Sequence, residues 1–350
     1  MTTIPAQDLE QYGEIIDRLV TTPIGRSRGN LFQPMKIVNM YDAARAKFGR
    51  PLCLMAAEMI HERVKPGDNV LILTGSYHPL HFPVGEMDGP PGGASLALSL
   101  STGLGVQPFF ANEPPLVKLM EEACKAVGLL PMPYDQAIQR DHTAVVVSFP
   151  ITDHEESKRA AQELLDTYNF SCVVTSERLG RNRQGRYHSA GGTERETQDR
   201  CKVDHIVDLA RERGILTVGV GDGGNEIGFG SIFEETRKIV NWGEECRCPC
   251  NDGIVSIVET DALIVAATSN WGVAGLEAAL AMLTGNQDMM HDRDTEQRVL
   301  HRLADMGCAD GATLMTTPTC DGTPESASLD IVDLLKGTVG QAFRTFNRRF

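Results

Sequence analysis

Near the start of the chain, hydrophobic and polar residues recur with a helical period. Apolar residues recur every three or four positions over 9–20, which predicts an amphipathic helix that ends before the next proline. Two more helices are predicted over 34–48 and 51–64, and Pro66-Gly67-Asp68 marks a turn. Residues 1–66 are therefore expected to form a helical N-terminal extension.

Beyond this turn the period changes repeatedly between strand and helix. Six short runs rich in apolar and β-branched residues are predicted as strands, at 70–74, 106–111, 144–149, 172–175, 216–220 and 262–267. Amphipathic helical segments separate them, which predicts an α/β fold: a doubly wound, mostly parallel sheet of about six strands with helices on both faces. Because no linker divides the chain, one continuous domain over 67–350 is favoured over two independent domains.

Composition and charge narrow the classes of protein. The 350 residues are 41% hydrophobic and 23% charged, which excludes extensive disorder, and no apolar run approaches the length of a membrane helix. The net charge of -14 argues against nucleic-acid or membrane partners and leaves a homo-oligomer open. The first residues lack the basic end and apolar core of a signal peptide, and the nine cysteines are an odd number. Reduced thiols and a cytoplasmic location are expected.

In an open parallel sheet, ligands bind beyond the carboxyl ends of the strands, so functional residues are expected in the loops after the predicted strands. The loop over 74–93 is rich in glycine and opens a helix, and the free N–H groups near Gly89–Gly93 suit an anion. A plain loop is the alternative. The loop over 176–188 holds four arginines within nine residues, which match carboxylates or form a solvated basic loop.

Two later loops carry different side chains. Six glycines fall within the twelve residues 219–230, together with Asp222 and Glu226. These carboxylates would repel phosphate and attract an ammonium or a metal ion, and a tight structural turn is the alternative. Segment 268–272 offers helix-capping side chains and Trp271, which either walls a pocket or packs in the core.

Three cysteines crowd into Cys246-Arg247-Cys248-Pro249-Cys250. Zinc sites usually space paired cysteines with two residues between them, which the Cys-x-Cys-x-Cys pattern does not match well, and no histidine lies nearby in the sequence. The sequence therefore favours neither a metal cluster nor a reactive thiol here.

Taken together, the loops resemble the D-glutamate cyclase family. The resemblance is carried by Thr74-Gly75, Asp88–Gly92, Glu177-Arg178, Gly180–Asn182, Tyr187, Gly221–Gly228, Ser269–Gly272 and Asp321-Gly322. It implies a Rossmann-like hydro-lyase of D-amino acid metabolism that cyclises D-glutamate to 5-oxo-D-proline with loss of water and uses no organic cofactor.

The substrate implied by the resemblance has two carboxylates and one ammonium. Its expected contacts are Asp88, Gly89, Gly92, Gly93, Arg178, Arg181, Asn182, Gly223, Gly224, Asn225, Ser269, Asn270 and Trp271. Asp222 or Glu226 would hold the ammonium and accept its proton, and His188 or Tyr187 would act as the acid. Alternatively, Asp222, Glu226 or Glu177 would hold Mn²⁺ or Mg²⁺ as a Lewis acid.

Two further expectations follow. The arginine loop should be partly exposed, so that Arg178→Ala weakens substrate binding without affecting folding. The alternatives to a cyclase are a phosphate- or nucleotide-dependent enzyme that uses the 74–93 loop and a non-catalytic protein that binds small acids.

Overall fold

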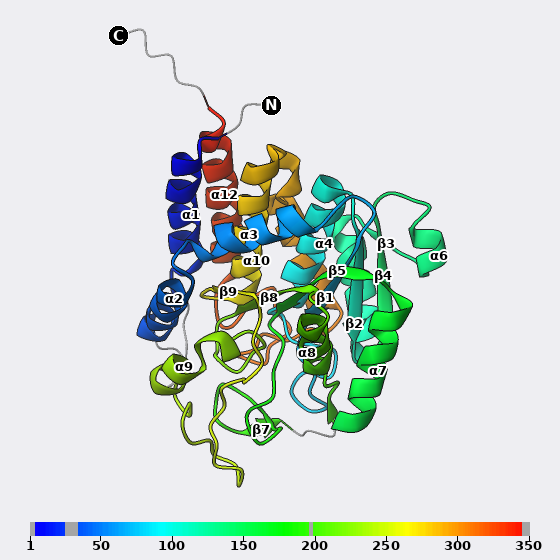
Figure 1. The fold of residues 1–350 in the computed structure, drawn as a ribbon, viewed down its shortest axis with the longest axis vertical. Helices are drawn as coiled ribbons and strands as arrows, with labels where there is room; N and C mark the ends of the chain where they lie inside the picture. The colour runs from blue at the N-terminus through cyan, green and yellow to red at the C-terminus, as the bar shows by residue number, and fades with distance from the viewer. Residues whose placement is uncertain (1–3, 25–33, 196–198, 345–350) are drawn as a thin grey trace.

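The computed structural model describes residues 4–24, 34–195 and 199–344, and within them a seven-stranded parallel sheet forms the centre of the molecule (Figure 1). Its order is β3-β4-β2-β1-β5-β8-β9. The strands are β1 (Asn69–Thr74), β2 (Gln107–Asn112), β3 (Leu130–Pro131), β4 (Thr143–Ser148), β5 (Phe170–Ser176), β8 (Leu216–Gly221) and β9 (Ala262–Val265). All six predicted strands are present, and the seventh, β3, is a two-residue edge strand. The predicted α/β class is confirmed.

The N-terminal region is helical as predicted, and residues 25–33, between the first two predicted helices, lie outside the described residues. The helices are α1 (Ala6–Val20), α2 (Pro34–Phe48), α3 (Leu52–Arg63), α4 (Pro90–Leu104), α5 (Val117–Val127), α6 (Tyr134–Ala137), α7 (His154–Thr167), α8 (Asp204–Glu212), α9 (Phe233–Ile239), α10 (Ser269–Thr284), α11 (Arg293–Asp305) and α12 (Glu325–Ala342). A small antiparallel hairpin pairs β6 (Tyr187–His188) with β7 (Glu194–Arg195). Among the described residues, each helix is too short or too polar to cross a bilayer.

The sheet separates two hydrophobic cores. Successive side chains of a strand point to opposite faces, so Val70 and Ile72 of β1 enter one core while Leu71 and Leu73 enter the other. The larger core includes α3, α4 and α10, and the smaller one includes α7 and α8 (Figure 1). Burial on both faces explains why the strands are continuous apolar runs rather than alternating ones.

The strand order creates a topological switch point at β1. From β1 the chain first builds outward through β2 and β4, and then returns to place β5 on the other side of β1. The ends of these two strands lie side by side, with Thr74 paired to Ser176. The loops that leave them diverge, which opens the crevice where such sheets bind ligands.

Candidate active site

The loops after β5 and β8 are joined at the carboxyl edge of the sheet. The Gly180 N–H donates to the Asn225 carbonyl at 3.0 Å, and the Ile227 N–H donates to the Arg178 carbonyl at 2.8 Å. The two segments whose proximity the cyclase hypothesis requires are therefore in direct contact.

Four acidic side chains, here called the acidic cluster, meet beside this junction: Asp88, Glu177, Asp222 and Asp321. Single carboxylate oxygens of Asp88, Glu177 and Asp222 all lie within 4.8 Å of one another, and these three residues are buried. They follow β1, β5 and β8, while Asp321 precedes α12. Glu177 and Asp321 have φ of 51° and 49°, a region that side-chain-bearing residues rarely adopt and that is concentrated at functional sites.

Burial and mutual repulsion dominate the electrostatics of the acidic cluster. Burial raises the pKa of Asp222 well above its ordinary value, and the neighbouring Asp321, Glu226 and Asp88 raise it further, while Lys36 of α2 opposes them. Burial also raises the pKa of Asp88, to about 6, despite the N–H donors around it. Carboxylates this close cannot all ionise together, so the cluster retains protons or attracts a cation near neutral pH.

Asp88 and Asn270 cap each other's helices across the switch point. The Asp88 carboxylate accepts from the N–H groups of Ser269 and Asn270, both at 2.8 Å, at the start of α10. The Asn270 Oδ1 accepts from the N–H groups of Gly89 at 3.0 Å and Gly92 at 2.9 Å, at the start of α4. A Cβ atom on Gly92 would lie 2.8 Å from that oxygen, so glycine is required there.

This reciprocal capping changes the interpretation of the first glycine-rich loop. The N–H groups of Gly89 and Gly92 are already satisfied by Asn270, and the Gly93 N–H donates to the Gly89 carbonyl at 2.8 Å. The anion site predicted at Gly89–Gly93 therefore has its donors engaged within the protein.

The two carboxylates of the glycine-rich loop after β8 differ in their surroundings. The oxygens of Glu226 accept from the N–H groups of Gly223 and Gly224, both at 2.8 Å, so this side chain holds the loop together. Asp222 has no hydrogen-bond partner among the described residues. Glu177 accepts from the Ser269 hydroxyl at 2.6 Å. Of Asp222 and Glu226, Asp222 is therefore the carboxylate left available to a ligand.

The predicted exposure of the arginine loop is wrong at Arg178. Only 3% of its side chain is exposed, and both of its terminal nitrogens donate to Glu113, at 2.8 and 2.6 Å. Burial alone would lower the pKa of the Arg178 guanidinium, but Glu113 more than offsets this and raises it. The loop's other arginines pair with acids too: Arg181 with Asp204 and Asp208, Arg183 with Asp252, and Arg186 with Glu194. The predicted carboxylate binders thus already hold carboxylates of their own chain.

Arg195 and Arg200, which the sequence analysis did not select, lack such partners. Arg200 is 4% exposed, and no carboxylate of the described residues lies within ion-pair distance of either guanidinium. The Arg200 Nε has no acceptor in the same part of the chain, and burial lowers the pKa of this guanidinium to about 10. Burial raises the pKa of Glu86 to about 7, and the positive charge of Arg195 partly opposes this rise. Arg195 therefore lies near an acid of the loop after β1 and Arg200 near Glu113 after β2, and neither forms an ion pair with a described residue.

Several predicted contact residues instead hold the framework. The Asn182 amide donates to the Gly253 carbonyl at 2.9 Å, and the Asn225 amide donates to the His188 carbonyl at 2.8 Å. Trp271 is buried in the large core and donates through Nε1 to Ser328 Oγ at 3.1 Å. These contacts explain how the loops keep their shape.

The two predicted acids also have partners within the protein. The Tyr187 hydroxyl donates to Asp204 at 2.7 Å. The His188 Nε2 lies 3.3 Å from the Cys248 sulfur and 3.6 Å from that of Cys250. No hydrogen bond joins either side chain to Asp222 within the described ranges.

The doubly wound sheet defines an α/β protein, and the acidic cluster lies at the edge where such sheets bind their ligands. Residues 20–336 match the family described as D-glutamate cyclase-like, C-terminal, and the chain belongs to that family. It is also 32% identical over 233 residues to the human protein named D-glutamate cyclase, mitochondrial. The aligned region covers 61% of this chain and 33% of the human protein. The matched part thus spans about a third of that relative's length.

Proposed function

We propose that the chain catalyses the cyclisation of D-glutamate to 5-oxo-D-proline with loss of water. The observation that carries this proposal is the acidic cluster at the switch point, inside the region that matches the family. Arg195 and Arg200 lie in loops nearby and form no ion pair within the described residues, so this region offers both charges that an amino diacid needs. The D configuration of the substrate rests on the family alone.

The unpaired charges suggest how the substrate is held. Arg200 and Arg195 would bind carboxylate, because neither forms an ion pair with an acid of the described residues. Asp222 would bind the ammonium, because its carboxylate has no other partner among the described residues. Fixing both ends folds the substrate, so that the amine and the side-chain carboxylate meet, which removes much of the entropic barrier to ring closure.

The reaction moves two protons from nitrogen to oxygen. The ammonium gives up two protons, the amine nitrogen bonds to the side-chain carboxyl carbon, and one carboxylate oxygen leaves with both protons as water. Asp222 and its neighbours suit this transfer because their raised pKa values let them accept and return protons near neutral pH. His188 and Tyr187 are not needed as acids in this scheme.

The cluster also fits a hard divalent cation. Its donors are carboxylate oxygens, the ligands that Mg²⁺ and Mn²⁺ prefer, and Asp88, Glu177 and Asp222 would hold the ion. Such an ion would polarise the reacting carboxylate. No organic cofactor is required by the proposed reaction.

Turnover of purified protein tests the proposal. D-glutamate should yield 5-oxoproline and L-glutamate much less, in assays run with EDTA, with Mg²⁺ and with Mn²⁺. No product from either enantiomer under any of these conditions would remove the activity. Tight binding of glutamate without turnover would favour the small-acid binding protein. Stabilisation by ATP or a sugar phosphate but not by glutamate would favour the phosphate-dependent enzyme.

Replacing Arg200 tests the assignment of the carboxylate site. Arg200→Gln should raise KM for D-glutamate about 10- to 100-fold, the scale of a lost charge-assisted hydrogen bond. Its melting temperature should fall only slightly, because the substitution breaks no ion pair of the described residues and removes a 3.4 Å hydrogen bond to the Tyr77 carbonyl and a contact with the Tyr187 ring. Arg213→Gln, which removes an arginine paired with Asp166, is the control and should keep the native KM. An unchanged KM in Arg200→Gln would exclude this residue from the site.

Location and partners remain proposals. We propose a cytoplasmic location, because all nine cysteines are free thiols. The net charge of -14 supports a small-molecule partner over nucleic acid or a membrane surface.

A further inference from the structure

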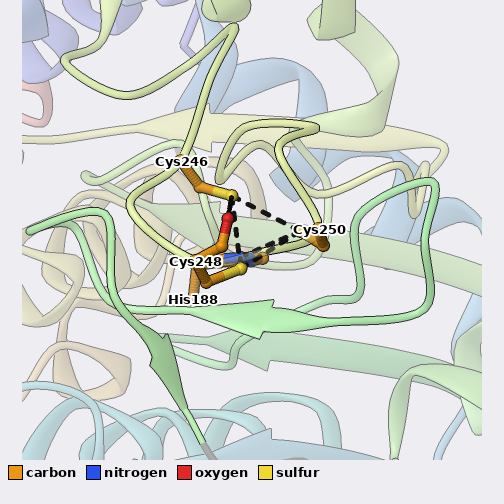
Figure 2. A group of neighbouring side chains, drawn as sticks. All are labelled: His188, Cys246, Cys248 and Cys250. Carbon is orange, nitrogen blue, oxygen red and sulfur yellow. Dashed lines mark hydrogen bonds between the residues drawn. The ribbon is translucent and has the colours of Figure 1, made fainter.

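Four metal-binding side chains converge outside the acidic cluster. The sulfur atoms of Cys246, Cys248 and Cys250 lie 3.2–3.3 Å apart, and the His188 Nε2 lies 3.3 Å from Cys248 and 3.6 Å from Cys250. All four donor atoms fall within 4.8 Å of one another. Figure 2 shows the histidine and the three thiols directed toward one another from two separate segments.

Disulfide formation does not explain this arrangement. A disulfide has a sulfur–sulfur length of about 2.05 Å, well below the separations seen here, and one bond would still leave the third cysteine and the histidine. Ordinary packing of thiols would not direct a histidine nitrogen to the same point. Three sulfurs and one imidazole are, however, a known ligand set of structural zinc.

The geometry fits a tetrahedral ion. Zinc–sulfur bonds of about 2.3 Å and a zinc–nitrogen bond of about 2.0 Å place sulfurs about 3.8 Å apart and sulfur about 3.5 Å from nitrogen. The observed separations are at or slightly below these values, so an ion at the centre would spread the sulfurs by about half an ångström. Cys246 and Cys250 are separated by three residues, which is also within the spacing that zinc sites use.

The surroundings explain what the ion would do. The connection from α9 to β9 covers residues 240–261 without a helix or strand, an unusual length for an ordered loop. The cluster would join this connection to the β6–β7 hairpin, which it also meets where the Arg247 N–H donates to the Gly192 carbonyl at 2.7 Å. The Asn182 amide, 3.5 Å from the Cys250 sulfur, adds an outer-shell donor.

We propose that His188, Cys246, Cys248 and Cys250 form a structural zinc site. Four protein ligands close the coordination sphere, which is typical of structural rather than catalytic zinc. The soft thiolates select zinc over the Mg²⁺ or Mn²⁺ suited to the acidic cluster, so the two sites would hold different ions. Because the His188 carbonyl accepts from Asn225, the ion would also anchor the glycine-rich loop beside Glu226.

Metal content and zinc titration of the full chain test this proposal. Purified protein should contain one zinc per chain by elemental analysis, or the reduced, metal-free protein should take up one equivalent in competition with a chromophoric chelator. Cobalt in place of zinc should give the visible absorption of tetrahedral thiolate coordination. Cys248→Ala and His188→Ala should lose at least 90% of the zinc, and zinc removal should lower the melting temperature of the native chain.

Two controls separate this site from others. Cys124→Ala removes a buried thiol far from the cluster in sequence and should retain one zinc. Asp222→Asn should also retain it, because the acidic cluster does not supply these ligands. Absence of zinc uptake by the reduced native chain, iron in place of zinc, or equal uptake by Cys248→Ala would overturn the proposal. The native-chain titration and cobalt spectrum decide the matter even if a variant does not fold.

Discussion

Asp222→Asn should lower kcat for D-glutamate cyclisation about 10²- to 10⁴-fold, the range of a lost general acid–base group. The same substitution should raise the melting temperature at pH 8. Burial and nearby acids raise the pKa of the Asp222 carboxyl, so ionising it in the folded protein costs free energy. An amide of the same shape carries no charge and avoids that cost.

The stability gain of Asp222→Asn should depend on pH, because the Asp222 carboxyl binds a proton. A carboxyl with a raised pKa in the folded state binds its proton more tightly folded than unfolded, so its contribution to stability declines as pH rises above about 4. The stability gain of Asp222→Asn should therefore be small at pH 4.5 and larger at pH 8. Thermal unfolding at the two pH values measures it, with Asp305→Asn, at the exposed end of α11, as the control. Full turnover, or a lower melting temperature at pH 8, would contradict the role given to Asp222.

Arg178→Ala should destabilise the fold by about 3–5 kcal/mol, as expected when one partner of a buried ion pair is removed. The substitution leaves Glu113 buried with its negative charge uncompensated, and it also removes the 2.6 Å hydrogen bond to the Gly75 carbonyl. Denaturant unfolding measures the loss of free energy. This result would replace the sequence-based expectation that the variant folds normally and only binds substrate more weakly.

Two comparisons identify the cause of the Arg178 effect. Arg183→Ala, at a half-exposed arginine of the same loop, should destabilise the fold far less, because an ion pair in contact with water contributes little to stability. The double variant Arg178→Met with Glu113→Gln should recover much of the lost stability, because no isolated charge remains. If Arg178→Ala unfolds at the same denaturant concentration as the native protein but shows a raised KM, the original assignment of Arg178 to substrate binding stands instead.

Periodicity was sufficient to predict most of the fold. The buried strands are apolar runs because both faces of the sheet are covered, and α5, α7 and α8 each expose a polar face, so both signals are local in the sequence. Helices α4 and α10, by contrast, are buried almost throughout. β3 was missed because a two-residue strand, Leu130-Pro131, has no measurable period. It is defined by its pairing to β4, which only the folded chain provides.

The location of the candidate site was predictable, whereas its internal partners were not. Ligands of a parallel sheet bind at the carboxyl edge, and Asp222, Glu177 and Asp88, which the loops after the strands supply, lie together there. Which charges neutralise each other depends on contacts between distant segments. Arg178 meets Glu113, 65 residues away, and Asp88 caps a helix that begins 181 residues later. The four arginines of the 176–188 loop therefore suggested a binding site for carboxylates, whereas in the structure they pair with acids of the same chain.

The contacts of the three clustered cysteines also depend on a distant segment and could not be predicted from the sequence. Within the sequence no histidine is near Cys246–Cys250, and the spacing alone gave no reason to expect a metal. The β6–β7 hairpin carries His188 to the sulfur atoms from 60 residues upstream of Cys248. His188, which the sequence suggested as a catalytic acid, thereby lies beside the three thiols.

The central claim is that the acidic cluster and the unpaired arginines together hold one amino diacid. A crystal structure of the Asp222→Asn variant with D-glutamate tests it most directly, because slow turnover should preserve the bound substrate. We expect the substrate nitrogen beside residue 222 and Glu177, and a carboxylate on Arg200 or Arg195. Glutamate bound at saturating concentration anywhere else, with this edge of the sheet empty, would contradict the account.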